Sequence, residues 1–557
     1  MMRRAILASR ILGAGVGITV ATTSIGSPAE SEERKRRRTT REPKWDCEVD
    51  FLVVGAGSAG CAVSARLAQS FPAKKTLLLE AGDTDDLPEI QTAVDYFGKV
   101  GNIFGSDRDH QYYAQGQDEL NGRALYWPRG RLVGGCSSFN TMVFMRPPKV
   151  DLDAWARGLG KGFEEFNWQG LLPYFKRVET HPGDPVVHGK TGPITVAPLN
   201  HSSHCEGGAV HFVTEAFCSA ANQALGIPLN TDFAKGTEGV GVNDVNACAG
   251  QRCNAAAYLK EVGAYPTGGS SKLSAVSTNP PGALHVWLGS KVERILFDDN
   301  NKAVGVVIKL NIPSEDRDEE TTDKGRTFDD NEISPRRKRD PSKMKVRVKV
   351  KKEIVLSCGA VDSPRLLLLS GIGPREQLED VGIDVRVDLP GVGQNLKDHL
   401  HIPICYRIPS GVKPHSHSNI CEGSLFTRLN ESARSPDIQL HCGTIFFEPD
   451  GFSPLGEGFT LTPSLIYPKS VGSVELESDD PEDKPIINAN YLTDPADEDF
   501  KQLVKGVRFA RKLGQAMLAQ LPSGGKEAFP GPDVSTEEDI GDYVRKYVGT
   551  MYHPMGT

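Results

Sequence analysis

Three glycines near the start of the chain, Gly55, Gly57 and Gly60, have the spacing with the clearest chemical meaning. They follow an apolar run, residues 51–54, and precede small or apolar residues at helical spacing. The first glycine permits a tight turn, and the second lets the backbone approach a pyrophosphate. The third lets the helix pack on the strand, and the helix N-terminus presents N–H groups to the phosphates. The pattern predicts a dinucleotide-binding turn.

A second apolar run, residues 76–79, ends in Glu80, twenty residues after Gly60. A carboxylate in this position can accept hydrogen bonds from ribose hydroxyls. Strand, glycines, helix, strand and acid therefore occur in the order that a dinucleotide-binding fold requires. NAD and FAD share this arrangement, so the motif alone leaves both cofactors open.

Composition places these elements in a large globular chain. The 557 residues exceed a single typical domain, and about two to four domains are expected. A net charge of −8 gives no support to a nucleic-acid surface. The eleven cysteines are scattered without a CxxC pair, which argues against a disulfide framework and a zinc module, and we predict no metal site.

Two segments are expected to lie outside the fold. Residues 1–45 begin with arginines, lack acids before Glu30 and end in a basic linker. They resemble a mitochondrial presequence, with a secretory signal as the alternative, and their apolar run is too short for a transmembrane span. Residues 313–345 are charged and nearly free of apolar side chains, and they separate two strand-like runs, 303–310 and 346–356. We expect a disordered insertion in a hairpin.

Longer motifs identify a family resemblance that runs from about Asp50 to the end of the chain. The stretch GRALYWPRGRLVGGCSSFNTMVFMRPP (122–148) resembles the first signature of the glucose–methanol–choline (GMC) oxidoreductases, with Cys136 and Phe139 as departures from it. The stretch GAVDSPRLLLLSGIG (359–373) resembles the second signature. LPGVGQNLKDH (389–399) is similar to a further family segment.

The resemblance implies FAD rather than NAD, and an α/β fold. It implies a Rossmann-like FAD-binding domain of the glutathione-reductase type and a second substrate domain built on an antiparallel sheet. The expected regions are 46–375 (FAD-binding), 376–460 (substrate domain) and 461–557 (C-terminal). The implied cofactor-binding residues are Gly55, Gly57, Ser58, Gly60 and Glu80 on the ADP half, Val292 at the adenine, and Gly134, Ser137 and Asn140 near the isoalloxazine.

The resemblance also implies the chemistry. A histidine removes the hydroxyl proton of a primary alcohol while the carbon-bound hydrogen leaves as hydride to flavin N5, which yields an aldehyde. The family's motif for that histidine is similar to YHPMGT (552–557), so His553 is the implied base. The stretch after residue 145 is most similar to the choline-dehydrogenase-like branch. The alcohol itself and the electron acceptor, whether oxygen, a quinone or a protein, stay open.

Family members continue beyond the position of Thr557, with a second catalytic His or Asn and a segment that closes the FAD site. We therefore expect the C-terminal end of the family pattern to be missing. A truncated gene model or a fragment is the favoured interpretation, and a natural short form or a degenerate paralogue are the alternatives.

Two other functions are weighed against alcohol oxidation. Residues 419–443 resemble the light-driven fatty acid photodecarboxylases, with Cys421 at their cysteine position but His441 where they have an arginine. Without that fixed cation, a carboxylate loses its bidentate partner. A hydroxynitrile-lyase-like or inactive flavin-binding relative is the second alternative.

Overall fold

The computed structural model describes residues 44–93, 100–201, 210–266, 275–276, 284–310, 345–409, 418–447, 458–521 and 524–557. The chain divides into two units, Met1–Lys44 and Trp45–Thr557, and the second contains the two large sheets, of seven and eight strands. The expected targeting segment and the charged insertion fall almost entirely outside the described residues.

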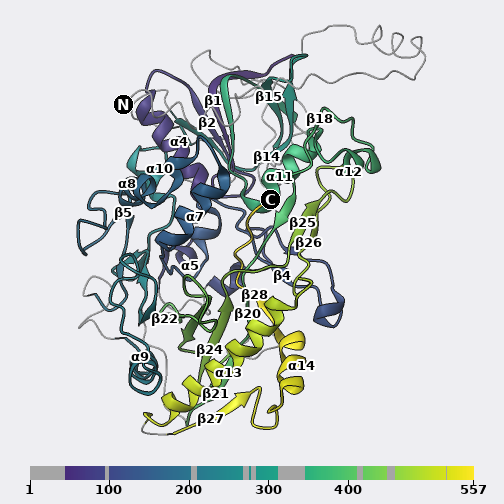
Figure 1. Ribbon diagram of the computed structural model, residues 1–557. Helices are drawn as coiled ribbons and strands as arrows, with labels where there is room; N and C mark the ends of the chain where they lie inside the picture. The colour runs from purple at the N-terminus through teal and green to yellow at the C-terminus, as the bar shows by residue number, and fades with distance from the viewer. Residues whose placement is uncertain are drawn as a thin grey trace, which may run out of the picture. The chain divides into compact units, whose positions relative to one another are not determined.

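The first sheet has seven strands and holds the glycine motif (Figure 1). Its strands β13, β2, β1 and β16 are parallel to one another. At the edges, β12 pairs antiparallel with β13, β15 pairs antiparallel with β16, and β14 pairs antiparallel with β15. The order is β12 (Ala275–Val276), β13 (Leu284–Trp287), β2 (Thr76–Leu79), β1 (Cys47–Val54), β16 (Lys345–Leu356), β15 (Ala303–Leu310) and β14 (Ser290–Phe297). The antiparallel pairing of β15 with β16 confirms the hairpin that flanks the insertion.

Helices cover both faces of this sheet, which explains its continuous apolar strands. Val53 packs in one cluster with Ala65 of α4 (Ser58–Ser70). The next residue towards the N-terminus, Leu52, points to the opposite face and packs in a second cluster with Leu366 of α11 (Gly359–Leu369). The parallel strands and their helices confirm the predicted Rossmann-like α/β fold.

The second sheet is antiparallel and has eight strands, as expected for a substrate domain. The main path runs β27 (Lys526–Phe529), β21 (Ile404–Arg407), β24 (Gly458–Leu465), β23 (Ile438–Gly443), β22 (Cys421–Thr427) and β8 (Gly239–Val242). The short strand β20 (Leu400–His401) pairs with both β24 and β28 (Gly549–Thr550). The sheet thus joins the last residues of the chain to its middle.

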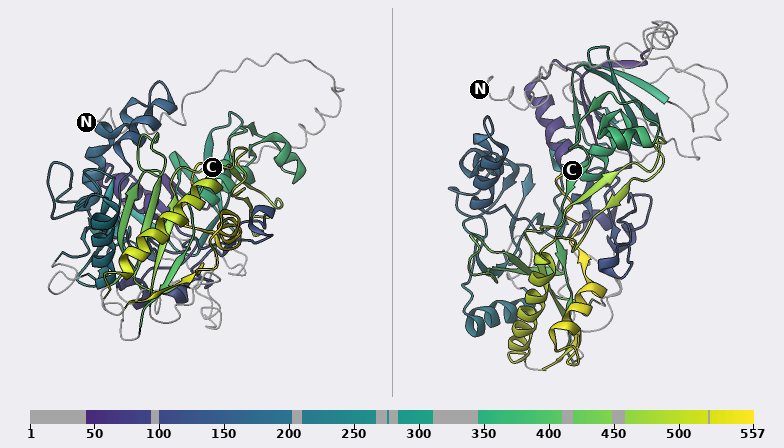
Figure 2. Two further views of the ribbon diagram at one scale, coloured as in Figure 1. Left: turned by 60° about the horizontal axis from the view of Figure 1, so that its bottom comes forward. Right: turned by 45° about the vertical axis from the view of Figure 1, so that its right-hand side comes forward.

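One face of the second sheet packs in the largest hydrophobic core of the described residues, and the other face lines a cavity. Figure 2 shows α13 (Glu498–Leu518) lying along the strands, and α13 also contacts α9 (Phe212–Leu225). Along β23, Leu440 and Cys442 belong to this core, while Gln439 and His441 line a cavity on the opposite side. The alternation of strand side chains therefore separates packing from the site.

The remaining helices surround these two sheets. They include α7 (Lys149–Leu159), α8 (Trp168–Val178), α10 (Ala257–Glu261), α12 (Arg375–Asp380) and α14 (Glu537–Tyr547). None of the helices in the described ranges has the length and apolar character needed to cross a bilayer.

Candidate active site

The turn between β1 and α4 uses its three glycines in different ways. An ideal Cβ on Gly60 would lie 1.8 Å from the Gly55 carbonyl oxygen, and Gly55 itself has φ +92° with Ser357 O 2.7 Å from such an atom. These two glycines are required by packing and backbone conformation. A Cβ on Gly57 would meet no heavy atom closer than 4.0 Å. Protein packing therefore does not explain why Gly57 lacks a side chain.

A second glycine-rich loop closes over this turn. The Gly134 N–H donates to Ala56 O at 2.8 Å, and a Cβ on Gly135 would lie 2.8 Å from the Gly57 Cα. The Ser137 hydroxyl donates to Gly134 O at 2.7 Å and accepts from the Ala255 N–H at 3.1 Å, which fixes the loop. The two backbones meet without side chains, and the N-terminus of α4 stays open beside them. This cradle fits the pyrophosphate of a dinucleotide.

Glu80 lies next to the same turn and is buried. Its two carboxylate oxygens accept from the Ala56 N–H at 2.8 Å and the Gly82 N–H at 2.9 Å. Burial raises the pKa of Glu80, against these two hydrogen bonds. The Ser290 N–H donates to Glu80 O at 2.7 Å, which brings the start of β14, and Val292 with it, to the end of β2.

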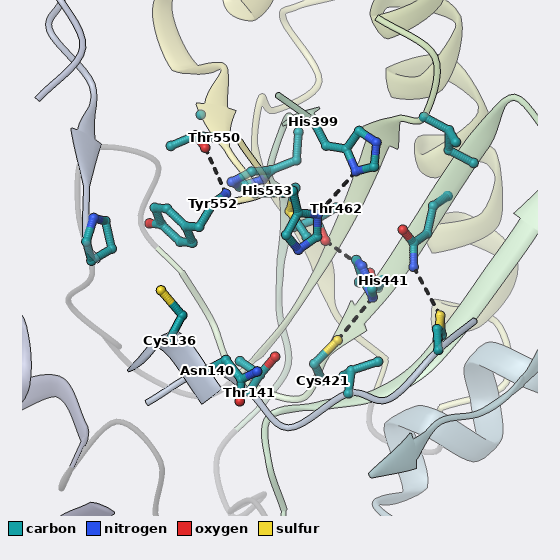
Figure 3. Close-up of a pocket in the computed structure, with 18 of the residues that line it drawn as sticks. Cys136, Asn140, Thr141, His399, Cys421, His441, Thr462, Thr550, Tyr552 and His553 are labelled. Carbon is teal, nitrogen blue, oxygen red and sulfur yellow. Dashed lines mark hydrogen bonds between the residues drawn. The ribbon is translucent and has the colours of Figure 1, made fainter. Parts of the chain in front are cut away.

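A cavity of about 1170 Å³ lies beyond the glycine-rich loop. Figure 3 shows the loop residues Cys136 and Asn140 on one side and the histidines of the second sheet and the C-terminal segment on the other. The Asn140 side-chain oxygen accepts from the Met142 N–H at 3.1 Å and from Arg252 at 2.9 Å. Its amide nitrogen is therefore the group left for the cavity.

Four histidines line this cavity: His399, His401, His441 and His553. The Nδ1 atoms of His399 and His553 are 3.1 Å apart and share one hydrogen bond, so the Nε2 atom of each ring is free of that contact (Figure 3). Partial removal from bulk water by the surrounding protein, followed by the neighbouring histidines and Arg129, lowers the pKa of His553, whose ring is nevertheless exposed to the cavity. Burial lowers the pKa of both His401 and His441 to about 4. The wall is a set of neutral imidazoles.

Asp398 holds the segment that carries His553. Its buried carboxylate accepts from the His553 N–H at 2.9 Å, from the Tyr491 hydroxyl at 2.7 Å and from the Thr550 hydroxyl. Trp127 in turn donates to the Tyr491 oxygen at 3.0 Å. Burial raises the pKa of Asp398, while these hydrogen bonds oppose the change. The network fixes the backbone, and thereby the direction, of His553.

Cys421 and His441 come from adjacent strands and form a contact in the wall of the cavity. The Cys421 Sγ lies 3.1 Å from His441 Nδ1 (Figure 3). The Ser424 hydroxyl lies 3.0 Å from the same nitrogen. Burial raises the pKa of the Cys421 thiol to about 12. A protonated thiol and a neutral imidazole provide no fixed positive charge, so this pair is poorly suited to hold a carboxylate.

The structure thus brings most of the predicted residues into two neighbouring groups. Gly55, Gly57, Ser58, Gly60, Glu80, Gly134 and Ser137 surround the β1–α4 turn, and Asn140 and His553 face the cavity. The site also contains Asp398, His399 and His401, which were not predicted from the sequence. They lie in LKDHLHIPI, where polar residues interrupt an apolar stretch, and this was the available signal.

Comparison with known proteins identifies relatives along almost the whole chain. The model for GMC oxidoreductase, N-terminal part, matches residues 49–324 and 335–401, and the C-terminal part matches 468–557. The C-terminal region, whose end we expected to be missing, is therefore represented in the chain. Choline dehydrogenase, mitochondrial, of Homo sapiens is 33% identical, with 92% of this chain and 80% of the relative covered. Alcohol dehydrogenase (acceptor) of Pseudomonas putida is 31% identical, with 91% and 85% covered.

Solved structures agree with these sequence matches. Pyridoxine 4-oxidase from Mesorbium loti superposes with a TM-score of 0.73 at 27% identity, over 91% of this chain and 88% of that chain. A formate oxidase has the same fold, with a TM-score of 0.73 at 23% identity over 92% and 89% of the two chains. The resemblance inferred from the two signatures is confirmed, and this chain belongs to the GMC oxidoreductase family of FAD-dependent enzymes.

Proposed function

We propose that the protein oxidises a primary alcohol to an aldehyde, with FAD as the cofactor and His553 as the base. The observation that carries this proposal is the position of His553. Asp398 fixes it through the backbone, and it faces a cavity that Cys136 and Asn140 of the glycine-rich loop also line. The curated relatives named as alcohol and choline dehydrogenases support the same reaction class.

For the cofactor, we assign the ADP half to the turn of Gly55, Gly57, Ser58 and Gly60 together with Glu80. We place Val292 at the adenine, and Gly134, Ser137 and Asn140 beside the isoalloxazine. The open N-terminus of α4 and the missing side chain at Gly57 support this assignment. The first sheet would then belong to the FAD-binding domain and the second to the substrate domain. The proposed regions 46–375, 376–460 and 461–557 do not coincide with the two sheets, because the second sheet takes β8 from the first region and β27 and β28 from the third.

Bound FAD supplies the two-electron acceptor for the carbon-bound hydrogen of the alcohol. The protein's own contribution is the removal of the hydroxyl proton. Because the pKa of His553 is lowered, its ring is neutral in the free protein and its Nε2 takes no part in the hydrogen bond with His399, although the lowered pKa also makes the ring a weaker base. The contact of its Nδ1 with His399 keeps the ring oriented and offers a second imidazole to share the resulting charge.

The test is flavin bleaching after anaerobic addition of primary alcohols to the purified holoprotein. The flavin of the wild-type protein should bleach. The His553→Gln variant should retain FAD, while its rate of flavin reduction falls by about 100-fold or more. Near-full reduction by the variant would overturn the role of His553. A lyase or an inert flavin protein would keep its colour with every alcohol.

We also propose a mitochondrial location, with residues 1–45 as the presequence. The support is the arginine-rich, acid-poor start of the chain and a mitochondrial choline dehydrogenase among the relatives. A fluorescent protein fused after residue 45 should be imported and cleaved. Secretion of the fusion would favour the alternative signal.

A further inference from the structure

The charges on the wall of the cavity narrow the class of alcohol. We infer that the substrate is a neutral, largely apolar alcohol, and that the cavity disfavours a quaternary ammonium alcohol such as choline. The inference rests on the proposed function, because it names the substrate class of the same site. It departs from the substrate of several relatives, which are named as choline dehydrogenases and oxidases.

Negative charge is scarce around the cavity. Among the described residues that line it, Asp151 carries the only carboxylate. Both of its oxygens lie 2.8 Å from the Tyr467 hydroxyl, and burial raises the pKa of Asp151. The carboxylate of Asp398 lies behind the wall, where it is buried and accepts three hydrogen bonds from protein groups. Neither group is a free counter-charge for a cation in the cavity.

Positive charge is present on the side of the cavity that carries His553. Arg129 lines the cavity and donates to Tyr552 O and Pro128 O, both at 2.6 Å, and within the described part of the chain it forms no ion pair. The positive charge of Arg129 contributes to the lowered pKa of His553. Arg146, by contrast, is paired with Glu179 at 2.6 Å. An ammonium group bound near His553 would meet the field of Arg129, which the buried Asp398 carboxylate offsets only from behind the wall.

The remaining wall suits hydrocarbon. Apolar side chains from both domains line the cavity, among them Val143, Met145, Ile420, Phe426 and Ile466. A quaternary ammonium has no N–H group, so it can be recognised only by negative charge or by converging aromatic faces. Aromatic rings also line the wall, and four of them form two pairs. Phe104 and Phe139 meet edge to face at 5.6 Å, and Tyr113 and Tyr126 are tilted at 5.1 Å. Since aromatic faces are present on the wall, it is the charge of the wall that disfavours a quaternary ammonium.

The experiment compares choline with 3,3-dimethylbutan-1-ol, which has the same shape but a carbon in place of the charged nitrogen. Rates of anaerobic flavin reduction are measured for both alcohols over a range of concentrations. The neutral alcohol should be favoured in kcat/KM by about ten-fold or more. Equal efficiency, or a preference for choline, would overturn the inference.

Gln439 offers a variant that tests the charge argument directly. It lines the cavity two residues before His441 on β23, and its amide nitrogen lies 3.7 Å from the Met145 sulfur. Gln439→Glu adds a carboxylate with almost no change in shape, so it should shift the selectivity towards choline by about ten-fold. Gln439→Leu is the neutral control and should not shift it. A shift in both variants would show that shape, rather than charge, decides selectivity.

Failure of the proposed function can be separated from failure of this inference. If no alcohol in a panel that includes benzyl alcohol and 1-octanol bleaches the flavin, alcohol oxidation itself is refuted. Binding of choline and of 3,3-dimethylbutan-1-ol is then compared by the perturbation of flavin fluorescence. Tighter binding of the neutral compound would still support the charge argument, and equal or tighter binding of choline would refute it.

Discussion

Gly57 provides the sharpest separation between a role in folding and a role in cofactor binding. A methyl group in Gly57→Ala would fit without a clash, since its nearest heavy atoms, Gly135 Cα and Ser357 O, would both lie 4.0 Å away, in ordinary van der Waals contact. The backbone there has φ −72° and ψ −167°, which any residue adopts. Gly60→Ala is the matched control, because its methyl group would lie 1.8 Å from the Gly55 carbonyl oxygen.

The expected magnitudes differ for the two variants. For Gly57→Ala, the free energy of unfolding of the apoprotein should change by less than about 0.5 kcal/mol. For Gly60→Ala it should fall by about 1–3 kcal/mol or more, since backbone atoms must move. In the holoprotein, the new methyl group of Gly57→Ala would displace the pyrophosphate from about two charge-assisted hydrogen bonds at the start of α4. At about 1.5 kcal/mol each, the loss is about 3 kcal/mol, or more than about 100-fold in the Kd for FAD.

The assay combines denaturant unfolding of the apoproteins with titration of FAD. We expect the Gly57→Ala apoprotein to be as stable as the wild type but to bind FAD more weakly. We expect the Gly60→Ala apoprotein to be less stable than the wild type. Wild-type affinity for FAD in Gly57→Ala would refute the placement of the pyrophosphate at this turn. Equal destabilisation of both apoproteins would refute the packing argument.

Further predictions concern the buried polar groups. Asp398→Ala leaves three donors without their acceptor and should lower the free energy of unfolding by about 3 kcal/mol or more, whereas Asp398→Asn keeps one acceptor oxygen and should cost less; urea unfolding compares the two. Burial alone would lower the pKa of His188, but hydrogen bonds to Asp232 and Glu179 outweigh it and raise the pKa to about 9. A raised pKa in the folded state stabilises in full below about pH 6.5, and a contribution on the order of 3 kcal/mol should disappear as the pH rises through about 9. His188→Gln should flatten this pH dependence of Tm, and an unchanged slope would count against it. Cys421, whose thiol pKa burial raises to about 12, should resist iodoacetamide near about pH 8 in the folded protein, and rapid alkylation by mass spectrometry would contradict that environment.

Much of the first sheet could be predicted from the sequence because its signals are local. The strand at residues 76–79, the glycine turn and the hairpin strands around the insertion each follow from consecutive residues. The docking of the Gly134 loop on the turn could be expected only through the family resemblance, because the two segments are far apart in the chain. No local pattern states that Gly135 meets Gly57.

The wall of histidines shows why the rest of the site was harder to predict. His399 and His401 lie on or beside β20, His441 lies on β23, and His553 follows β28. Four strands of one sheet, β23, β24, β20 and β28, must therefore pair before these rings become neighbours. Each histidine alone has the pattern of an ordinary polar residue on a strand. The composition of the chain likewise does not show which charged side chains line the cavity, so the preference for a neutral alcohol could not be inferred from the sequence.

The alternation along β23 also bears on how this enzyme could change its substrate over evolutionary time. Leu440 and Cys442 pack in the core, whereas Gln439 and His441 line the cavity. Substitutions at the cavity positions leave the packing against α13 untouched, so they need not lower stability. A lineage could therefore explore new alcohols through this strand by single substitutions, without first acquiring compensating mutations in the core.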